Sequence, residues 1–297
     1  MHFPCPAKRL LVTGASGFLG WNLCRLAATR WQTHGTFQQH PVDIAGVVTH
    51  AVDLTDDRAL AALVEKIAPH AVIHTAAATN PNTCEMEPER SARINLQATV
   101  RLGNLCAGRG LPLVFTSTDL VFDGLHPPYS EQDPVRPTNV YATHKAAAET
   151  ALQRDCPGAV ICRLPLLFGR GAPAAGGFFA EMLRRMRLGM ELRLFDDEYR
   201  TPVSAETAAR GLLLALERGK GILHLGGRER ISRYEFGELA ARILGFSQAK
   251  LVRTRQRDVV LPAARPPDVS LDSGYAYSLG YAPPSLEDEF MRLRKSL

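Results

Sequence analysis

Tyr141 and Lys145 lie four residues apart in the predicted helix NVYATHKAAAETAL. This spacing places both side chains on one face of a helix, so that they can contact the same substrate. A tyrosine with its ordinary pKa is a poor acid–base group at neutral pH, and an adjacent ammonium favours its phenolate form. The pair therefore predicts acid–base chemistry, although the spacing alone also fits an unrelated surface tyrosine and lysine.

A second polar group supports the chemical interpretation. The sequence TSTD follows the apolar residues LPLVF, so Ser117 and Thr118 fall at the carboxyl end of a predicted parallel strand. Ligands bind at this end of the strands in parallel sheets. We therefore predict that Thr118 and the adjacent Asp119 contact the substrate beside Tyr141 and Lys145.

A glycine-rich turn near the N-terminus predicts a dinucleotide site. The pattern G-x-x-G-x-x-G stands directly after the predicted strand LLVT and at the start of a predicted helix. Glycine permits the tight turn and lets backbone N–H groups approach a pyrophosphate at the positive end of the helix. The alternative is a glycine-rich turn without a ligand. The residues assigned to the cofactor here are Gly14, Ser16, Gly17, Phe18, Leu19 and Gly20.

The adenosine end of that site is less well specified. Asp53, followed by Leu54, could accept a hydrogen bond from the adenine amino group, or it could cap the next helix. The second predicted strand ends in residues 36–40, TFQQH, which contain no carboxylate. A carboxylate there usually binds the free ribose 2′-hydroxyl of NAD, so its absence favours NADP over NAD. The expected arginine is also absent, and His40 or Lys8 is the available cation.

Short apolar strands alternate with helices through the first part of the chain. The strand candidates are LLVT, THGTFQ, AGVVTHAVDL, AVIHTAAA, LPLVFTST and AVICRLP, and the helices between them include 56–67 and about 89–107. This alternation predicts an α/β fold, a Rossmann-type doubly wound parallel sheet. We assign residues 1–165 to an NAD(P)-binding domain and residues 166–297, where the alternation weakens, to a smaller C-terminal substrate-binding lobe.

Composition excludes several other classes of protein. Lys and Arg number 35 against 30 Asp and Glu, a net charge of +5 that lacks the dense basic stripe of a nucleic-acid binder. The six cysteines contain no C-x-x-C pair, which argues against a zinc site or a disulfide framework, and no ligand spacing demands any other metal. No segment reaches the ~18 apolar residues of a membrane span. We expect a cytoplasmic protein with no nucleic-acid or membrane partner.

Five segments in this order resemble the extended short-chain dehydrogenase/reductase family: TGASGFLG, VIHTAAA, FTSTDLVFDG, PPYSEQDPVRPTNVYATHK and RLPLLFG. Within that family they are most similar to the dTDP-4-dehydrorhamnose reductases and the related regulatory beta subunit of methionine adenosyltransferase. The resemblance runs from about residue 10 to about residue 279. It implies that Thr118 is the catalytic hydroxyl, Tyr141 the acid–base group and Lys145 the lysine that lowers the tyrosine pKa and holds the nicotinamide ribose.

The resemblance also implies further contacts with the cofactor. Ala76, Ala77 and Ala78 match the segment that lines it, and Pro165 lies where the family passes under the nicotinamide. Asn95 matches a structural asparagine, although an asparagine on the helix surface fits equally well. The family topology also allows part of the C-terminal lobe to return to the main sheet.

The implied reaction is NADP-dependent reduction of a nucleotide-linked 4-keto-6-deoxy sugar, with NAD as a possible cofactor and a possible homodimer as the assembly. Arg200 and Arg265 are the candidates for the substrate diphosphate, because a guanidinium can bind phosphate through two hydrogen bonds. Either arginine could instead form an ion pair at the surface or between the lobes. Two other functions stay open: a nucleotide-sugar epimerase or dehydratase, and a non-catalytic NADP-binding regulatory subunit.

Overall fold

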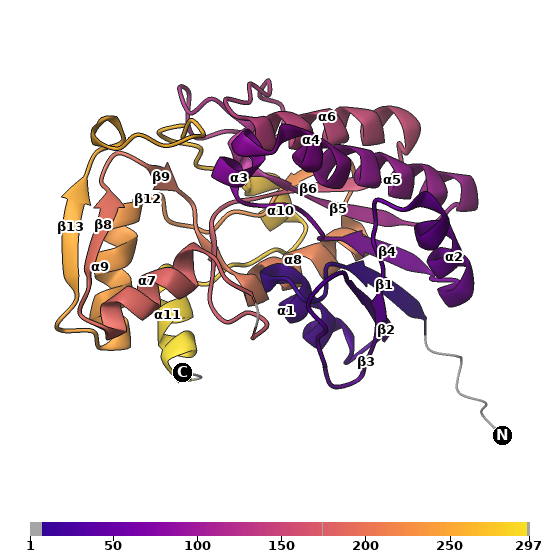
Figure 1. Ribbon diagram of the computed structural model, residues 1–297, viewed down its shortest axis with the longest axis horizontal. Coiled ribbons are helices and arrows are strands. Elements are labelled where there is room, and N and C mark those ends of the chain that lie inside the picture. Colours follow the sequence, from indigo (N-terminus) through magenta and orange to yellow (C-terminus); the bar gives the residue numbers. More distant parts are fainter. Residues whose placement is uncertain (1–7, 174, 296–297) are drawn as a thin grey trace.

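The computed structural model describes residues 8–173 and 175–295. Its centre is a sheet of parallel strands in the order β3-β2-β1-β4-β5-β6-β11, with the order reversing between β1 and β4 (Figure 1). These strands are β1 (Arg9–Thr13), β2 (Gln32–Phe37), β3 (Val47–Ala51), β4 (Ala71–His74), β5 (Leu113–Thr118), β6 (Val160–Leu164) and β11 (Ile222–His224). The predicted doubly wound α/β sheet is confirmed.

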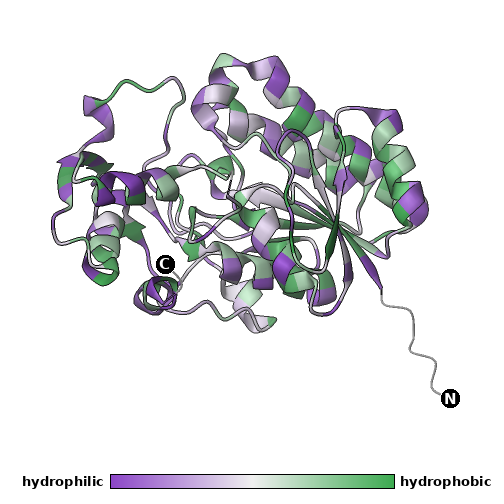
Figure 2. Ribbon diagram, turned by 60° about the horizontal axis from the view of Figure 1, so that its bottom comes forward, coloured by the Kyte–Doolittle hydropathy of each residue, from purple (hydrophilic) through white to green (hydrophobic). Residues whose placement is uncertain are grey.

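Helices cover both faces of this sheet because successive strand residues point to opposite sides. Leu10 and Val12 pack against one helical layer, whereas Leu11 between them packs against the other. The first layer holds α1 (Phe18–Ala27) and α8 (Ala205–Arg218), and the second holds α2 (Asp57–Ile67), α5 (Ala98–Arg109) and α6 (Val140–Asp155). In Figure 2 the strands are largely hydrophobic and the helices carry both hydrophobic and hydrophilic residues, which fits this layered arrangement.

A smaller C-terminal lobe lies beside the carboxyl ends of the strands, at the left of Figure 1. Its core includes four clustered phenylalanines, among them Phe168 and Phe236, which meet edge to face with ring centroids 5.3 Å apart. The elements of this lobe are α7 (Phe178–Arg187), β8 (Glu191–Phe195), α9 (Arg233–Leu244), β13 (Lys250–Thr254) and α11 (Leu286–Arg294). The two short strand pairs β7 (Leu167–Phe168) with β10 (Val203–Ser204), and β9 (Tyr199–Arg200) with β12 (Ile231–Ser232), connect the lobe to the rest of the chain.

The boundary at residue 165 needs one amendment. Residues 205–224 form α8 and β11, and β11 pairs in parallel with β6 as the last strand of the main sheet. The polypeptide therefore leaves the main sheet after β6 and returns to it, as the family topology allows. Smaller elements complete the fold: α3 (Pro81–Met86), α4 (Pro88–Ser91), η1 (Ala92–Gln97), η2 (Asp119–Val121), η3 (Gln256–Asp258) and α10 (Gly274–Ser278). Within the described ranges no helix is long and apolar enough to cross a membrane.

Candidate active site

The turn between β1 and α1 has the tight geometry that its glycines predict. Gly14 adopts a φ of +78°, and a Cβ placed on it would lie 2.8 Å from the Ala76 Cα. A Cβ on Gly20 would lie 2.1 Å from the Gly14 carbonyl oxygen. Both contacts are too short for any side chain, so these two positions require glycine. The first turn of α1 is thereby held close to the loop that follows β4.

The beginning of α1 suits an anion. Gly17 is the exposed N-cap residue, and within the described residues no side chain caps this helix end. The amides of the first turn of a helix have no intrahelical partner and carry partial positive charge. Ser16, Phe18 and Leu19, which flank the cap, are each partly exposed. The amide donors at the start of α1 and the glycines of the turn, which have no side chains, therefore fit a bound pyrophosphate.

Asp53 and Gln38 meet beyond the ends of β3 and β2. The Asp53 carboxylate accepts hydrogen bonds from the backbone and the hydroxyl of Thr55, at 2.8 and 2.7 Å. These bonds and one from the Gln38 side chain lower the pKa of Asp53, so it is ionised at neutral pH. The helix cap is Asp56, which accepts from two amides of α2, and the alternative that Asp53 caps this helix is wrong. Asp53 is exposed and Leu54 partly buried.

The loop Ala76–Ala78 is held by hydrogen bonds to the Asn95 side chain. Asn95 is 1% exposed and lies in the π-helical segment η1. Its side chain accepts from the Ala78 amide at 2.9 Å and donates to the Ala78 carbonyl at 3.0 Å. The alternative that Asn95 is a surface residue is therefore wrong: it holds the backbone of the loop that packs on Gly14. Pro165 is buried directly after β6.

Tyr141, Lys145 and Thr118 come together at the carboxyl end of β5. Tyr141 stands in the first turn of α6, which begins at the cap residue Asn139. The Lys145 ammonium donates to the Thr116 carbonyl at 2.6 Å and lies 3.9 Å from the centre of the Phe115 ring. Tyr141 and Lys145 are 7% and 2% exposed. The helix thus holds both groups against the strand that carries Thr118.

The buried surroundings control the protonation of the two groups. Burial raises the pKa of Tyr141 far above its ordinary value, the Asp119 charge adds to this effect, and a hydrogen bond with Thr118 opposes it. Burial lowers the pKa of Lys145 to about 7, and the Glu149 charge opposes this fall. At neutral pH the phenol therefore keeps the proton that a general acid must donate.

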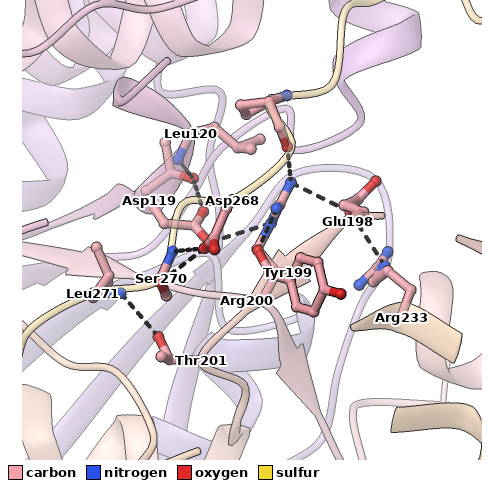
Figure 3. A network of polar contacts seen from close by, with 12 residues as sticks. Asp119, Leu120, Glu198, Tyr199, Arg200, Thr201, Arg233, Asp268, Ser270 and Leu271 are labelled. Carbon is pink, nitrogen blue, oxygen red and sulfur yellow. Dashed lines mark hydrogen bonds and ion pairs between the residues drawn. The ribbon is translucent and has the colours of Figure 1, made fainter. Parts of the chain in front are cut away.

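Asp119, directly after Thr118 in the sequence, pairs with Arg200 between the two lobes (Figure 3). The Thr118 hydroxyl donates to one Asp119 oxygen at 3.1 Å, and the other oxygen lies 3.7 Å from the Arg200 Nε. Arg200 also donates to the backbone carbonyls of Tyr199, at 2.6 Å, and Pro266, at 3.2 Å. Burial raises the pKa of Asp119 to about 6, although the Arg200 charge opposes this.

These contacts favour the alternative given above for Arg200. The residue is 3% exposed, donates to two backbone carbonyls and pairs with Asp119, as expected of an inter-lobe ion pair. The sequence motif could not indicate that Asp119 and Glu198 would enclose the guanidinium.

Glu198 and Arg233 were not predicted from the sequence. The Arg233 Nε lies 3.3 Å from the Glu198 carboxylate, and the guanidinium packs 3.7 Å from the centre of the Phe178 ring. Arg265 reaches across to the Asn82 side chain on α3, at 3.1 Å. Burial raises the pKa of Glu198, but the charges of the three arginines outweigh it and the net shift is downward.

This inter-lobe cluster carries a surplus of positive charge. Its cations are Arg200, Arg233 and Arg265, and its described carboxylates are Asp119 and Glu198. A buried cationic surplus is costly unless an anion balances it. Ser232 and Glu235 form a capping box at the start of α9, where Arg233 lies. This pattern predicts a helix start in the sequence, but it does not predict the direction of the Arg233 side chain.

A parallel sheet of this order, with a glycine turn and a Tyr-x-x-x-Lys pair beside a threonine, defines a Rossmann-fold protein of the NAD(P)-dependent reductase and epimerase class. The family description "RmlD substrate binding domain" matches residues 8–292. The chain belongs to this family, which confirms the resemblance found in the sequence.

Individual relatives include both enzymes and a subunit. The chain is 28% identical over 283 residues to methionine adenosyltransferase 2 subunit beta of Danio rerio, covering 93% of this chain and 86% of the relative. It is 30% identical over 289 residues to the probable low-salt glycan biosynthesis reductase Agl14 of Haloferax volcanii, covering 95% and 96%. A solved dTDP-4-dehydrorhamnose reductase of Clostridium acetobutylicum superposes with a TM-score of 0.84 at 25% identity, covering 97% of this chain and 99% of that one.

Proposed function

We propose that the protein is an NAD(P)H-dependent reductase of a nucleotide-linked 4-keto-6-deoxy sugar. The observation that carries this proposal is the meeting of Tyr141, Lys145 and Thr118 at the carboxyl end of β5, beside the glycine turn. Ligands of doubly wound sheets bind at this edge, near the point where the strand order reverses. The similarity to a glycan biosynthesis reductase supports the reaction class.

NADPH is the proposed cofactor, with NADH as the alternative. The turn at Gly14, the open start of α1 and the loop Ala76–Ala78 are the surfaces that would hold it. When bound, it would supply the hydride. The residues directly after β2 include Gln38 and no carboxylate, which favours NADP, whereas the ionised Asp53 that meets Gln38 there favours NADH.

The chain's own residues would handle the proton. Tyr141 is protonated at neutral pH and would donate its proton to the carbonyl oxygen of the substrate as negative charge develops there. Thr118 lies beside the phenol and would orient that oxygen. Lys145 would hold the nicotinamide ribose and favour the phenolate that remains.

The charge of the inter-lobe cluster supports a nucleotide sugar as the substrate. Arg233 is 16% exposed at its side chain and Arg265 is partly exposed, whereas Arg200 is enclosed. We propose that Arg233 and Arg265 bind the substrate diphosphate, whose negative charge would balance the surplus of the cluster. Guanidinium and phosphate groups form strong charge-assisted hydrogen bonds.

Tyr141→Phe tests the assignment. The variant keeps the ring but loses the proton donor, so we expect kcat for reduction of a dTDP-4-keto-6-deoxy sugar to fall by at least ~10², with the thermal midpoint little changed. The measurement is NADPH oxidation followed by absorbance. Tyr275→Phe, at an exposed tyrosine of α10, is the matched control and should keep full activity. Equal rates for wild type and Tyr141→Phe would refute the role.

A non-catalytic regulatory subunit is the second candidate. The similarity to methionine adenosyltransferase 2 subunit beta, over 93% of this chain, is the observation that favours it. Cofactor binding without turnover on a panel of keto sugars, together with copurification of a partner enzyme, would support this candidate. Redox-neutral conversion of a UDP sugar would instead indicate an epimerase. A cytoplasmic location and a homodimer remain predictions.

A further inference from the structure

His74, the last residue of β4, makes hydrogen bonds through both of its ring nitrogens. The strand lies between β1 and β5 in the main sheet, and His74 is 1% exposed. Its Nδ1 lies 2.6 Å from the hydroxyl oxygen of Thr13 on β1, and its Nε2 lies 3.0 Å from the hydroxyl oxygen of Thr99 on α5. Thr13 and Thr99 are 0% and 1% exposed. The three side chains therefore depend on one another for their hydrogen bonds.

The Thr99 hydroxyl determines which ring nitrogen of His74 carries the proton. Thr99 donates its one hydroxyl proton to the Asn95 carbonyl, at 3.0 Å, because a carbonyl can only accept. The Thr99 oxygen must then accept from His74, so the ring proton is on Nε2. Burial lowers the pKa of His74 to about 3, so the ring is neutral and Nδ1 accepts from the Thr13 hydroxyl.

Thr13 connects the imidazole to the backbone that follows β4. The Thr13 hydroxyl oxygen accepts from the Thr75 amide at 3.2 Å and from the Ala76 amide at 3.3 Å. A hydroxyl accepts two hydrogen bonds and donates one, so the Thr13 proton is the one left for His74. This count agrees with the assignment made from Thr99, on the other side of the ring.

The loop Ala76–Ala78 is held at both ends by one chain of hydrogen bonds. Thr13 accepts from its first amide, and the Asn95 side chain binds the amide and the carbonyl of its last residue. His74 joins these two anchors, through Thr13 on one side and through Thr99 and the Asn95 carbonyl on the other. The loop itself is partly exposed. The buried chain thus fixes a surface that a ligand can reach.

The charged group that faces His74 is Lys145. The imidazole stacks on the Phe115 ring with centroids 5.7 Å apart, and the Lys145 ammonium lies 3.9 Å from the centre of the same ring. A protonated imidazole would add a second buried cation here, and the Lys145 charge disfavours it. The neutral ring is therefore compatible with the lysine of the candidate active site.

We propose that His74 is a positioning residue for the dinucleotide, because its imidazole, with the proton on Nε2, joins Thr13 to Thr99 and so preorganises the loop Ala76–Ala78. A loop that is already fixed loses little conformational freedom when a ligand binds, which raises affinity. This inference rests on the proposed function insofar as the loop contacts a dinucleotide. His74 is buried and acts through the backbone of the loop, so it is not a catalytic residue.

Thr99→Val tests the chain at the end that is remote from the glycine turn. The variant keeps the shape of the side chain but leaves the His74 Nε2 proton without an acceptor. We expect the Kd of NADPH, and separately of NADH, to rise about tenfold, the scale of one net hydrogen bond. Fluorescence titration without substrate, well below the thermal midpoint of each protein, gives the Kd.

Two variants control for the loss of a helical hydroxyl. Thr99→Ser keeps the hydroxyl and should bind both dinucleotides as the wild type does. Thr150→Val removes a hydroxyl that donates to the Ala146 carbonyl, four residues earlier on α6, which is the same local bond that Thr99 makes on α5. It should leave both Kd values unchanged. A rise in Thr99→Val alone is the result that supports the proposal.

A double-variant cycle distinguishes one continuous chain from independent packing effects. His74→Asn can offer an oxygen to Thr13 but is too short to reach Thr99, so it should weaken binding to about the same extent as Thr99→Val. Each change breaks the same chain, so the combined variant should bind no more weakly than either single variant. Losses that add would show that His74 and Thr99 act separately, and would overturn the proposal.

NMR of the nitrogen-labelled wild type measures the state of the His74 ring directly. We expect a protonated Nε2 and an unprotonated Nδ1, with or without dinucleotide. A proton on Nδ1 would overturn the proposal, and so would loss of the fold in both Thr99→Val and His74→Asn, which would assign the chain to stability alone. Absence of dinucleotide binding by the wild type would defeat the proposed cofactor, whereas binding that both folded variants leave unchanged would defeat only this inference.

Discussion

The molecule contains two buried ionic networks that differ in charge balance. On the main sheet, one cation and one carboxylate, Arg163 and Glu149, meet in a fork with hydrogen bonds as short as 2.8 Å. Between the lobes, the ion pairs around Asp119 and Glu198 span 3.3 to 3.7 Å, and arginines outnumber the described carboxylates. The first network is complete within the protein, whereas the second lacks a negative charge.

This difference indicates what each network does. A balanced, well-aligned pair satisfies its own hydrogen bonds and can maintain a fixed geometry. A cationic surplus costs free energy until an anion enters, which is why we propose this cluster as the site of the substrate diphosphate. Burial alone would not separate the two cases, since Arg200 between the lobes is as inaccessible as Arg163 on the main sheet.

The largest expected effect concerns the balanced network. Arg163→Met leaves the Glu149 carboxylate without its partner, and we expect the free energy of unfolding to fall by about 3–5 kcal/mol. Adding Glu149→Gln removes the second charge and should recover much of that loss. Urea unfolding of the two variants and the wild type gives the comparison. Equal losses in the single and double variants would mean that lost packing, and not an unpaired charge, is responsible.

An intermediate effect concerns the unbalanced network. Arg233→Met removes one of its surplus cations, so we expect affinity for dTDP to fall by about 10- to 100-fold, the scale of a charge-assisted hydrogen bond. Stability should change little because the lost cation was not fully compensated. Calorimetric titration measures the affinity. Arg210→Met, at an exposed ion pair with Glu206 on α8, is the control and should bind dTDP normally. Unchanged affinity in Arg233→Met would remove this arginine from the proposed diphosphate site.

The smallest effect concerns Asp119. Its pKa in the folded protein is about 6, above the value of about 4 expected in the unfolded chain. Between these two values the folded protein binds more protons at this carboxyl, so its contribution to stability falls as pH rises from about 4 to about 6. Asp119→Asn should remove that component from the pH dependence of Tm, a change of a few degrees at most. Parallel Tm curves for wild type and variant would show that Asp119 is not perturbed.

The sequence predicted the sheet and the residues at its edge well, because both depend on local pattern. Alternating apolar strands and helices specify a covered parallel sheet, and Tyr141 and Lys145 meet through helical spacing alone. Thr118 joins them because strand ends share one edge of the sheet. The identity of the helix cap was more difficult, since Asp53 and Asp56 are both plausible and the actual cap is Asp56.

The inter-lobe cluster was less predictable because its members meet only through the tertiary fold. Asp119, Glu198 and Arg233 lie far apart along the chain, and no local spacing links them. The enclosure of Arg200 likewise depends on Asp119 and on the Pro266 carbonyl, which come from distant parts of the chain. The return of β11 to the main sheet likewise depends on pairing with β6, which a three-residue strand does not specify alone.

That return has a consequence for attempts to change specificity. The chain builds part of the smaller lobe, goes back to form α8 and β11, and then re-enters the lobe at β12 and α9. No single uninterrupted stretch therefore encodes the smaller lobe. Transplanting this lobe from a relative would require several junctions at once, each beside the main sheet. An exchange in one piece would detach the outermost strand, β11, from its neighbour β6.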